Sequence, residues 1–410
     1  MQSTSSRLQR LTPYAIAAGV VGVLAAAWVV TYVVAPHIGM FQDLFGRVAN
    51  VRNLQRSGNI YVPFRVEAFT YPPGAILFFY PLALVPLNDL AYLWTLLSIA
   101  ALVVALALVL RSFFELTPRA SAAFSLWIGL VSIVVFPPVT ECLAWGQTAT
   151  ILLLAVVLDA LCVTGSSKGV LVGLATALKV YPGAFIILWM VRREWRAAST
   201  AVVSGAAPTL AAWVIWPSSM QEFVKTMLLG HKELSHFAGG ATVRASSSLA
   251  SFFSRAPFHV GFLSTGAELL VCVIVLAVAL WGSHHLWLGG YALSSMVVAL
   301  LGSVIATPVA WDHYFSFVPL LLVIPFEIGF ADIFGRACVG AALVMMAPWY
   351  RLRRPTPGSL WASVWTFTSR NALLLASLAV LAAALGSTLQ RRRGAQRRPV
   401  FVASREVVDS

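Results

Sequence analysis

The sequence predicts an all-α protein, a polytopic bundle of about ten to twelve membrane helices. Hydrophobic residues make up 59% of the 410 residues and charged residues only 10%, whereas an average soluble domain is about a quarter charged. The mean hydropathy is +0.84, and the apolar residues gather in runs about long enough to cross a bilayer. These observations exclude an ordinary soluble enzyme and assign the chain to one transmembrane domain over residues 13–389.

The first apolar run, residues 13–35, follows a polar N-terminus, residues 1–12, that contains Arg7 and Arg10. A cleavable signal peptide also combines a basic start with an apolar run. This run is longer than a usual signal core, and further spans follow it. We therefore expect an uncleaved first helix with the N-terminus in the cytoplasm.

The next apolar stretch, residues 72–87, is about 15 residues long and contains Pro81 and Pro86. It is too short and too broken for a span, so we expect interfacial or re-entrant helices. The positive-inside rule supports this choice. If this stretch does not cross, the short basic loops around Arg111 and Arg192 lie in the cytoplasm, and if it crosses, they lie outside.

The remaining spans follow from the apolar runs. They are expected at 88–110, 120–137, 147–163, 168–179, 181–191, 198–216, 260–282, 286–306, 314–332, 336–350 and 371–389. The pair 168–179 and 181–191 is too short for two full crossings and predicts a helical hairpin that turns at Tyr181 and Pro182. Outer loops are expected at about 36–87 and 217–259, and a disordered basic cytoplasmic tail at 390–410.

The net charge of +13 is explained by topology and lipid headgroups, so nucleic acid is not expected as a partner. The four cysteines lack metal-ligand spacing and predict neither a metal site nor a disulfide framework. Three arginines, Arg351, Arg353 and Arg354, fall in a short outer loop against the positive-inside rule. Either the last spans are miscounted or this cluster is retained for an anionic ligand.

The unusual polar clusters all fall on the outer face in this topology. Because polar groups are costly in a bilayer, such clustering indicates a site. Their members are Asp43, Tyr71-Pro72-Pro73, Gln147, Lys179, Tyr181, Ser246-Ser247-Ser248 and Trp311-Asp312-His313. Ordinary structural roles also account for individual members: Asp43 as a helix cap, Lys179 as a snorkelling side chain, and His313 as an interface histidine.

In their order along the chain, these motifs resemble glycosyltransferase family 87. The resemblance covers residues from about 40 to 330, and the ordered set is more specific than any one motif. It rests on Asp43, Phe69-Thr70-Tyr71-Pro72-Pro73, Gly146-Gln147, Ala177-Leu178-Lys179-Val180-Tyr181-Pro182, Arg192-Arg193-Glu194-Trp195-Arg196, Ser248-Leu249 and Pro308-Val309-Ala310-Trp311-Asp312-His313.

The resemblance implies a fold of the GT-C type with juxtamembrane helices in the first outer loop. It also implies a polyprenyl-phosphate-sugar-dependent hexosyltransferase, with Asp43 as the catalytic base and His313 as the late catalytic histidine. This chain departs from the family at three places. Thr307-Pro308 stands where Ser-Pro is frequent, Tyr314 stands where a second histidine is frequent, and Ser246-Ser247-Ser248 replaces an Asn-Gln-Ser element. These departures favour a different acceptor and leave the sugar open.

The resulting hypothesis is an inverting transfer of a hexosyl group, mannose by resemblance, from polyprenyl phosphate to a hydroxyl of an extracytoplasmic glycolipid or glycan. Asp43 would accept the hydroxyl proton, while Lys179, His313 and an arginine would stabilise the leaving phosphate. The expected substrate-binding residues are Tyr71, Pro72, Pro73, Gln147, Lys179, Tyr181, Ser248, Trp311, Asp312, Arg351, Arg353 and Arg354. No cofactor or metal is expected. The expected partners are the lipid donor, the acceptor and membrane lipids. The expected location is a bacterial plasma membrane.

Two other classes remain open at this point. The first is a transporter or flippase of lipid-linked sugars, and the second is a scaffold protein of an envelope pathway. Transporters place ionisable groups near the membrane midplane, whereas most charges here lie at the ends of the expected spans. A scaffold would not need an ordered polar set on one face.

Overall fold

The computed structural model describes residues 2–61, 69–114, 116–225, 246–255, 265–347 and 360–396, and every regular element in these ranges is helical. Within these ranges, six helices are long and apolar enough to cross a membrane. The spans lie within α1 (Gln2–Val29) with its continuation to α2 (Ala35–Ile38), α5 (Leu87–Phe114), α6 (Pro118–Val135), α11 (Trp195–Ile215), α16 (Thr265–Leu288) and α21 (Ala372–Gln396). The predicted class, a polytopic helical membrane protein, is confirmed.

The other apolar helices are shorter or bent. The helix α7 (Pro137–Ala144) meets α8 (Ala149–Val157) and its π-helical extension (Leu158–Cys162) at 113°. Four shorter apolar segments are Ala75–Leu84, Tyr181–Val191, α17 (Ala292–Ala306) and α19 (Ile333–Met345). By length and composition, the described residues therefore contain six candidate spans, or seven if the bent pair is one span, and the four shorter segments are apolar helices below that length.

The expected hairpin at 168–191 is present as two short helices. The helix α9 (Val170–Leu178) and the helix α10 (Ala184–Val191) are joined by a 3₁₀ turn at Tyr181–Gly183. Close packing against α11 requires glycine on α9, because a Cβ on Gly173 would lie 2.3 Å from the Ala201 carbonyl oxygen. The turn places Lys179 and Tyr181 inside the bundle, where both are buried.

The prediction of one helical span over 314–332 is wrong. The chain there forms two 3₁₀ turns (Asp312–Phe315 and Val318–Leu322) and the short helix α18 (Ile324–Ile328). Pro319 and Pro325 lie at the first turns of the last two elements, where proline is tolerated, and interrupt the helical hydrogen bonding between them. Non-helical backbone is tolerated at membrane depth only inside protein, and Phe315, Leu320 and Ile324 are fully buried.

Two further expectations need correction near the C-terminus. The tail is not disordered from residue 390, because α21 continues to Gln396 and Arg391 binds Asp332. Residues 397–410 lie outside the described ranges. The short helices α12 (Pro217–Phe223), α15 (Leu249–Arg255) and α20 (Leu360–Arg370) lie in segments where no helix was expected.

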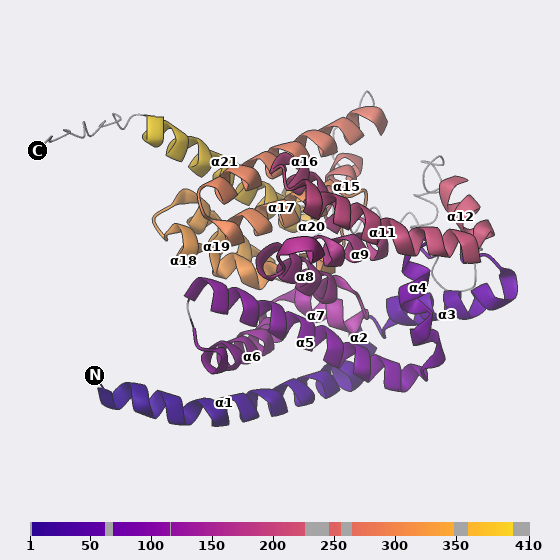
Figure 1. Ribbon diagram of the computed structural model, residues 1–410, viewed down its shortest axis with the longest axis horizontal. Helices are drawn as coiled ribbons and strands as arrows, with labels where there is room; N and C mark the ends of the chain where they lie inside the picture. Colours follow the sequence, from indigo (N-terminus) through magenta and orange to yellow (C-terminus); the bar gives the residue numbers. More distant parts are fainter. Residues whose placement is uncertain are drawn as a thin grey trace, which may run out of the picture.

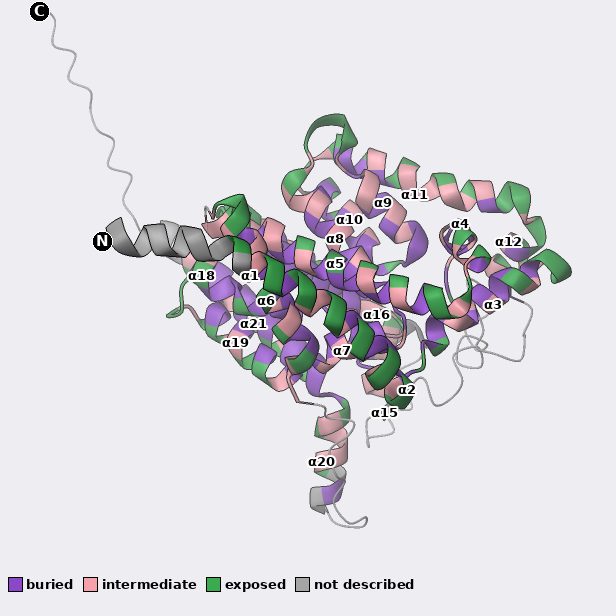
Figure 2. Cartoon of the chain, turned by 90° about the horizontal axis from the view of Figure 1, so that it is seen from below, coloured by how far each residue is buried: buried purple, intermediate pink, exposed green. Residues whose placement is uncertain are grey.

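The first loop forms a small helical group at one end of the bundle. It contains α3 (Gln42–Ser57), α4 (Ala75–Phe79) and a 3₁₀ turn at Pro81–Leu84, and none of these meets the length and composition of a span. Figure 1 shows α3, α4 and α12 together at this end, which we call the site end, while α1 begins and α21 finishes at the opposite, far end. The spans of α5 and α21 are the most buried, and α11 is the most exposed (Figure 2).

Candidate functional site

A strained turn places Asp43 at the start of α3. Met40 and Phe41 have φ of 50° and 53°, a left-handed conformation that is costly for residues other than glycine. The turn is held by α7, since the Phe41 amide donates to the Ala144 carbonyl at 3.0 Å and the Leu44 amide donates to the Trp145 carbonyl at 3.3 Å. Backbone strain held by surrounding structure is frequent at functional sites.

The bend between α7 and α8 provides the other half of this junction. Gly146 has φ of +68°, and a Cβ there would lie 2.5 Å from the Leu44 Cβ. Only glycine therefore allows the bend to approach α3 so closely. As a result Gln147 lies beside Asp43, although 104 residues separate them along the chain.

The Asp43 carboxylate is 9% exposed and has two neighbours that favour its charged form. Arg47 Nη1 lies 3.0 Å from Oδ1, one helical turn along α3, and Gln147 Nε2 donates to Oδ2. An ion pair and an amide donor together compensate for the removal of a carboxylate from water. Asp43 is therefore positioned as a buried anion.

Gln147 connects three functional side chains and is 2% exposed. Its Oε1 accepts hydrogen bonds from the Tyr71 hydroxyl at 3.2 Å and from Lys179 Nζ at 3.1 Å. Its backbone carbonyl accepts from Trp94 Nε1 at 3.3 Å. Burial raises the pKa of Tyr71, which lies in the loop before α4, so its hydroxyl stays protonated and donates.

Two cations flank the Tyr71 ring. The Arg47 guanidinium lies 4.7 Å from the ring centroid and Lys179 Nζ lies 5.4 Å from it. Lys179 also lies 3.8 Å from the centroid of Tyr314, which packs 5.6 Å from the Tyr181 ring. Two aromatic rings and one amide oxygen thus hold the buried Nζ of Lys179 close to Asp43.

His313 faces the same cluster from the turn Asp312–Phe315. Its ring lies 5.1 Å from Tyr314 and 6.3 Å from Trp311, and the charges of Lys179 and Asp43 act on it. The side chain is 5% exposed, and its Nε2 has no hydrogen-bond partner among the described residues. A buried ring nitrogen without a partner is costly, which marks it as a group that a substrate can engage.

Ser246, Ser247 and Ser248 brace the segment that carries His313. Ser248 Oγ donates to the Pro308 carbonyl at 2.9 Å, and Ser247 Oγ donates to Asp312 Oδ1 at 2.9 Å. The Ala310 amide donates to Ser246 Oγ at 2.9 Å. In the described contacts, Ser248 and Asp312 therefore have a positioning role.

The structure brings seven of the predicted site residues into one cluster, in which all except the half-buried Trp311 are buried. They are Asp43, Tyr71, Gln147, Lys179, Tyr181, Trp311 and His313. Pro72 and Pro73 contribute carbonyls that accept the first amides of α4. The predicted Arg351, Arg353 and Arg354 lie outside the described residues. Whether the last spans are miscounted or these arginines bind an anionic ligand therefore stays open.

Three residues of the cluster, Arg47, Tyr314 and Trp94, were not among the binding residues predicted from the sequence. Arg47 was expected only as some arginine of the first loop, and its i,i+4 spacing from Asp43 was a usable signal. Tyr314 was noted only as a departure from the family, yet it covers Lys179. Trp94, on α5, had no signal, because its contact with Gln147 depends on the fold.

Comparison with known proteins adds independent findings. Residues 69–310, more than half of the chain, match the model of glycosyltransferase family 87. A polyprenol-phosphate-mannose-dependent alpha-(1-2)-phosphatidylinositol pentamannoside mannosyltransferase of Mycolicibacterium smegmatis is 30% identical over 78% of this chain and 76% of its own length. A polyprenol-phosphate-mannose-dependent alpha-(1-2)-phosphatidylinositol mannoside mannosyltransferase of Mycobacterium tuberculosis is 26% identical over 62% of this chain, and the match spans 61% of that protein.

A third relative has a different activity. An alpha-(1->3)-arabinofuranosyltransferase of Mycobacterium tuberculosis is 28% identical over 47% of this chain and 46% of its own length. No solved structure matches the chain significantly.

Proposed function

Since the chain belongs to glycosyltransferase family 87, we propose that it transfers a hexosyl group from a polyprenyl-phosphate donor to a hydroxyl of a glycolipid or glycan acceptor. The observation that carries this proposal is the buried Asp43 carboxylate, held by Arg47 and Gln147 next to the Lys179 side chain. This arrangement combines a base with cations suited to a phosphate leaving group.

Asp43 is the base of the proposed reaction. Its carboxylate accepts the proton of the acceptor hydroxyl as that oxygen attacks the anomeric carbon. The bond from the anomeric carbon to the phosphate oxygen breaks on the opposite side, so the anomeric configuration inverts. Arg47, 3.0 Å from Asp43, favours the ionised form of that carboxyl, which is the state that a base requires.

The cations act on the leaving group. The phosphate monoester of the polyprenol gains negative charge as the glycosidic bond breaks, and groups positioned beforehand stabilise that charge most. Lys179 and Arg47, which both contact the Tyr71 ring, are the described cations of the cluster. His313 Nε2 is assigned to a polar contact with the donor, because it is buried and has no partner among the described residues. The charge that develops is already matched by these cations, so the proposed step requires neither a metal nor a cofactor.

The proposal also specifies the sugar that is transferred and the side of the membrane on which the site lies. Mannose is supported by the names of two relatives, while the arabinofuranosyltransferase relative keeps the sugar open to test. The basic ends of α5 and α6 lie at the far end of the bundle, which by the positive-inside rule faces the cytoplasm. The site end then faces outward from a bacterial plasma membrane.

The test is radiolabelled transfer in membranes that contain this protein, with polyprenyl-phosphate-mannose as donor. We expect wild-type membranes to label a lipid or glycan product and Asp43→Asn to abolish the labelling. Asp89→Asn is the matched control, since Asp89 is an exposed carboxylate at the start of α5. Wild-type transfer by Asp43→Asn would reject the base, and transfer only from a donor with another sugar would reject mannose.

A further inference from the structure

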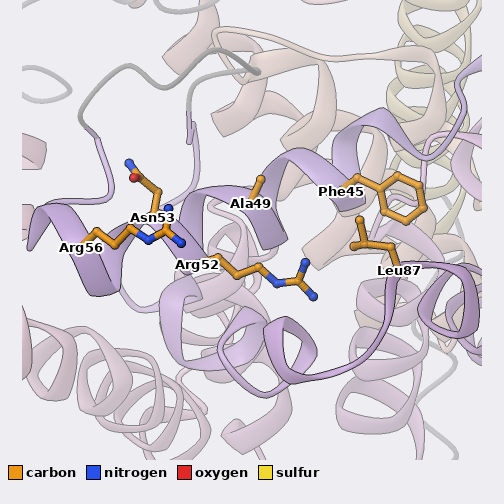
Figure 3. A pocket seen from close by; sticks show the side chains of 6 residues that line it. All are labelled: Phe45, Ala49, Arg52, Asn53, Arg56 and Leu87. Carbon is orange, nitrogen blue, oxygen red and sulfur yellow. The ribbon is translucent and has the colours of Figure 1, made fainter.

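A cavity of about 250 Å³ lies on the exposed side of α3. It is lined by Phe45, Ala49, Arg52, Asn53, Arg56 and Leu87 (Figure 3), and we call it the α3 groove. The α3 members follow helical spacing and lie on one side of that helix. Arg52 follows Asp43 by nine residues, which at about 100° per residue is half a turn around the helix. The α3 groove is therefore separate from the buried cluster around Asp43.

The polar part of the groove is cationic. Arg52 is held in place, because its Nε donates to the Ala83 carbonyl at 2.9 Å and its Nη2 donates to the Val85 carbonyl at 3.0 Å. Arg56 is exposed and has no ion pair among the described residues. The only acid of α3 is Asp43, which pairs with Arg47 on the other side of the helix. The groove therefore presents two guanidinium groups that no described carboxylate neutralises.

The other end of the groove is apolar. Phe45 and Leu87 line it, and Figure 3 shows their side chains next to each other at one end and Arg56 at the other. The adjacent Leu84 is 74% exposed. A ligand that fills the groove must therefore combine an anionic group with an apolar chain.

Aromatic side chains locate the groove relative to the membrane. Tyr32, on the first span, stacks on Tyr92 of α5 with ring centroids 6.4 Å apart, and Trp28 lies 5.8 Å from Tyr32. Exposed tyrosine and tryptophan rings concentrate at the headgroup level of a bilayer. Leu87 precedes Tyr92 by five residues, or roughly 7 to 8 Å along the helix axis. The groove therefore lies at the level where phospholipid phosphates are found.

We propose that the α3 groove binds an anionic glycerophospholipid of the membrane. Arg52 and Arg56 contact the phosphodiester, Asn53 contacts the headgroup hydroxyls, and an acyl chain packs against Phe45 and Leu87. Guanidinium groups suit phosphate oxygens because they donate in parallel pairs. A choline headgroup would bring a third cation beside the two arginines, so a net negative lipid is preferred. This site is distinct from the proposed transfer site and does not depend on the transfer activity.

The test is native mass spectrometry of the full chain in detergent, titrated with dioleoyl phosphatidylglycerol. We expect Arg56→Gln to weaken binding about tenfold, the loss of one hydrogen-bonded charge contact. Arg56→Glu should weaken binding further. Arg119→Gln is the matched control, because Arg119 is an exposed arginine at the far end, at the start of α6. Dioleoyl phosphatidylcholine and inorganic phosphate are the two comparison ligands.

The outcomes separate the possible ligands. Preference of the wild type for phosphatidylglycerol, lost in Arg56→Gln but kept in Arg119→Gln, supports the proposal. Equal binding of phosphatidylcholine, displacement of the lipid by inorganic phosphate at the same concentration, or unchanged binding in Arg56→Glu would each overturn it. Arg56 makes no described side-chain bond, so both Arg56 variants should melt at the wild-type temperature in detergent micelles that contain phosphatidylcholine. An unchanged melting temperature excludes misfolding as the cause.

Discussion

Gln147→Glu is a sensitive test of the buried cluster because it changes one atom of the side chain. The oxygen that accepts hydrogen bonds from Tyr71 and Lys179 is retained. The amide that donates to Asp43 becomes a carboxylate oxygen. Two carboxylates about 4 Å apart repel by about 4 kcal/mol at an effective dielectric constant of 20. That energy alone corresponds to roughly a thousandfold change in the proton affinity of the pair, and the protonated form of Lys179, whose Nζ lies 3.1 Å from the retained oxygen, offsets part of it.

The consequence is a pH-dependent defect. At about pH 8 both carboxylates are charged, Asp43 is displaced or destabilised, and we expect transfer to fall by about 10² to 10³. As the pH falls to about 6, the pair takes up one proton, and the introduced carboxylic acid, once protonated, again donates to Asp43. The ratio of variant to wild-type rate should therefore rise as pH falls, in an assay of labelled sugar transfer between pH 8 and pH 6.

Gln147→Ala is the control for this reasoning. It removes all three contacts and leaves the Tyr71 hydroxyl and Lys179 without their amide oxygen, at about 1 to 3 kcal/mol each. Its defect should be accompanied by a lower melting temperature and should not recover at low pH. A Gln147→Glu defect that is the same at every pH, or wild-type rates at pH 8, would refute the assigned donor role of Gln147.

His313→Phe should leave the melting temperature unchanged or raise it, since the Nε2 that is lost has no described partner. Sugar transfer should fall by about 10² or more. A lower melting temperature with retained transfer would contradict the contact between His313 and the donor. Lys179→Ala should raise the KM for the lipid donor more than the KM for the acceptor, and steady-state kinetics showing the reverse would remove Lys179 from the phosphate. At the far end, burial raises the pKa of Asp332, but the hydrogen bonds from Arg391, the Phe334 amide and Ser387 outweigh it, so the net pKa is lowered. The stability that this contact contributes is present above the pKa of Asp332 in the unfolded chain and is lost as pH falls through the lower pKa of the folded state. Asp332→Asn should therefore lower the free energy of unfolding by about 0.2 to 1 kcal/mol near pH 7. Thermal melts should show a smaller difference between variant and wild type at about pH 3.

The membrane class and the non-crossing first loop could be predicted because both depend on local properties. Apolar runs of sufficient length report spans directly, and the prolines at 81 and 86 interrupt the stretch 72–87. The same reasoning failed at 314–332. High hydropathy indicates that a segment is buried but does not show that it is helical. The segment with Pro319 and Pro325 is apolar because it is buried inside the protein, and the prolines interrupt its helix.

The members of the site were predictable as a set, but not their arrangement. Unusual polar residues in apolar surroundings identified Asp43, Lys179 and His313, and these three do lie together. The strained turn at Phe41 carried no sequence signal, because an aromatic residue rarely takes a left-handed conformation. The contact between Asp43 and Gln147 depends on that turn.

Composition and local spacing determine that this chain crosses a membrane and which polar residues are unusual, because the cost of burying charge in lipid acts on each segment separately. Contacts between distant segments determine the chemistry that these residues can perform. Gln147 meets Asp43 only because Gly146 lets the α7–α8 bend approach α3, and the Ala144 carbonyl holds the turn that leads into it. Such a junction is stabilised only when the whole bundle has packed, since the strain of the turn must be compensated by contacts made elsewhere.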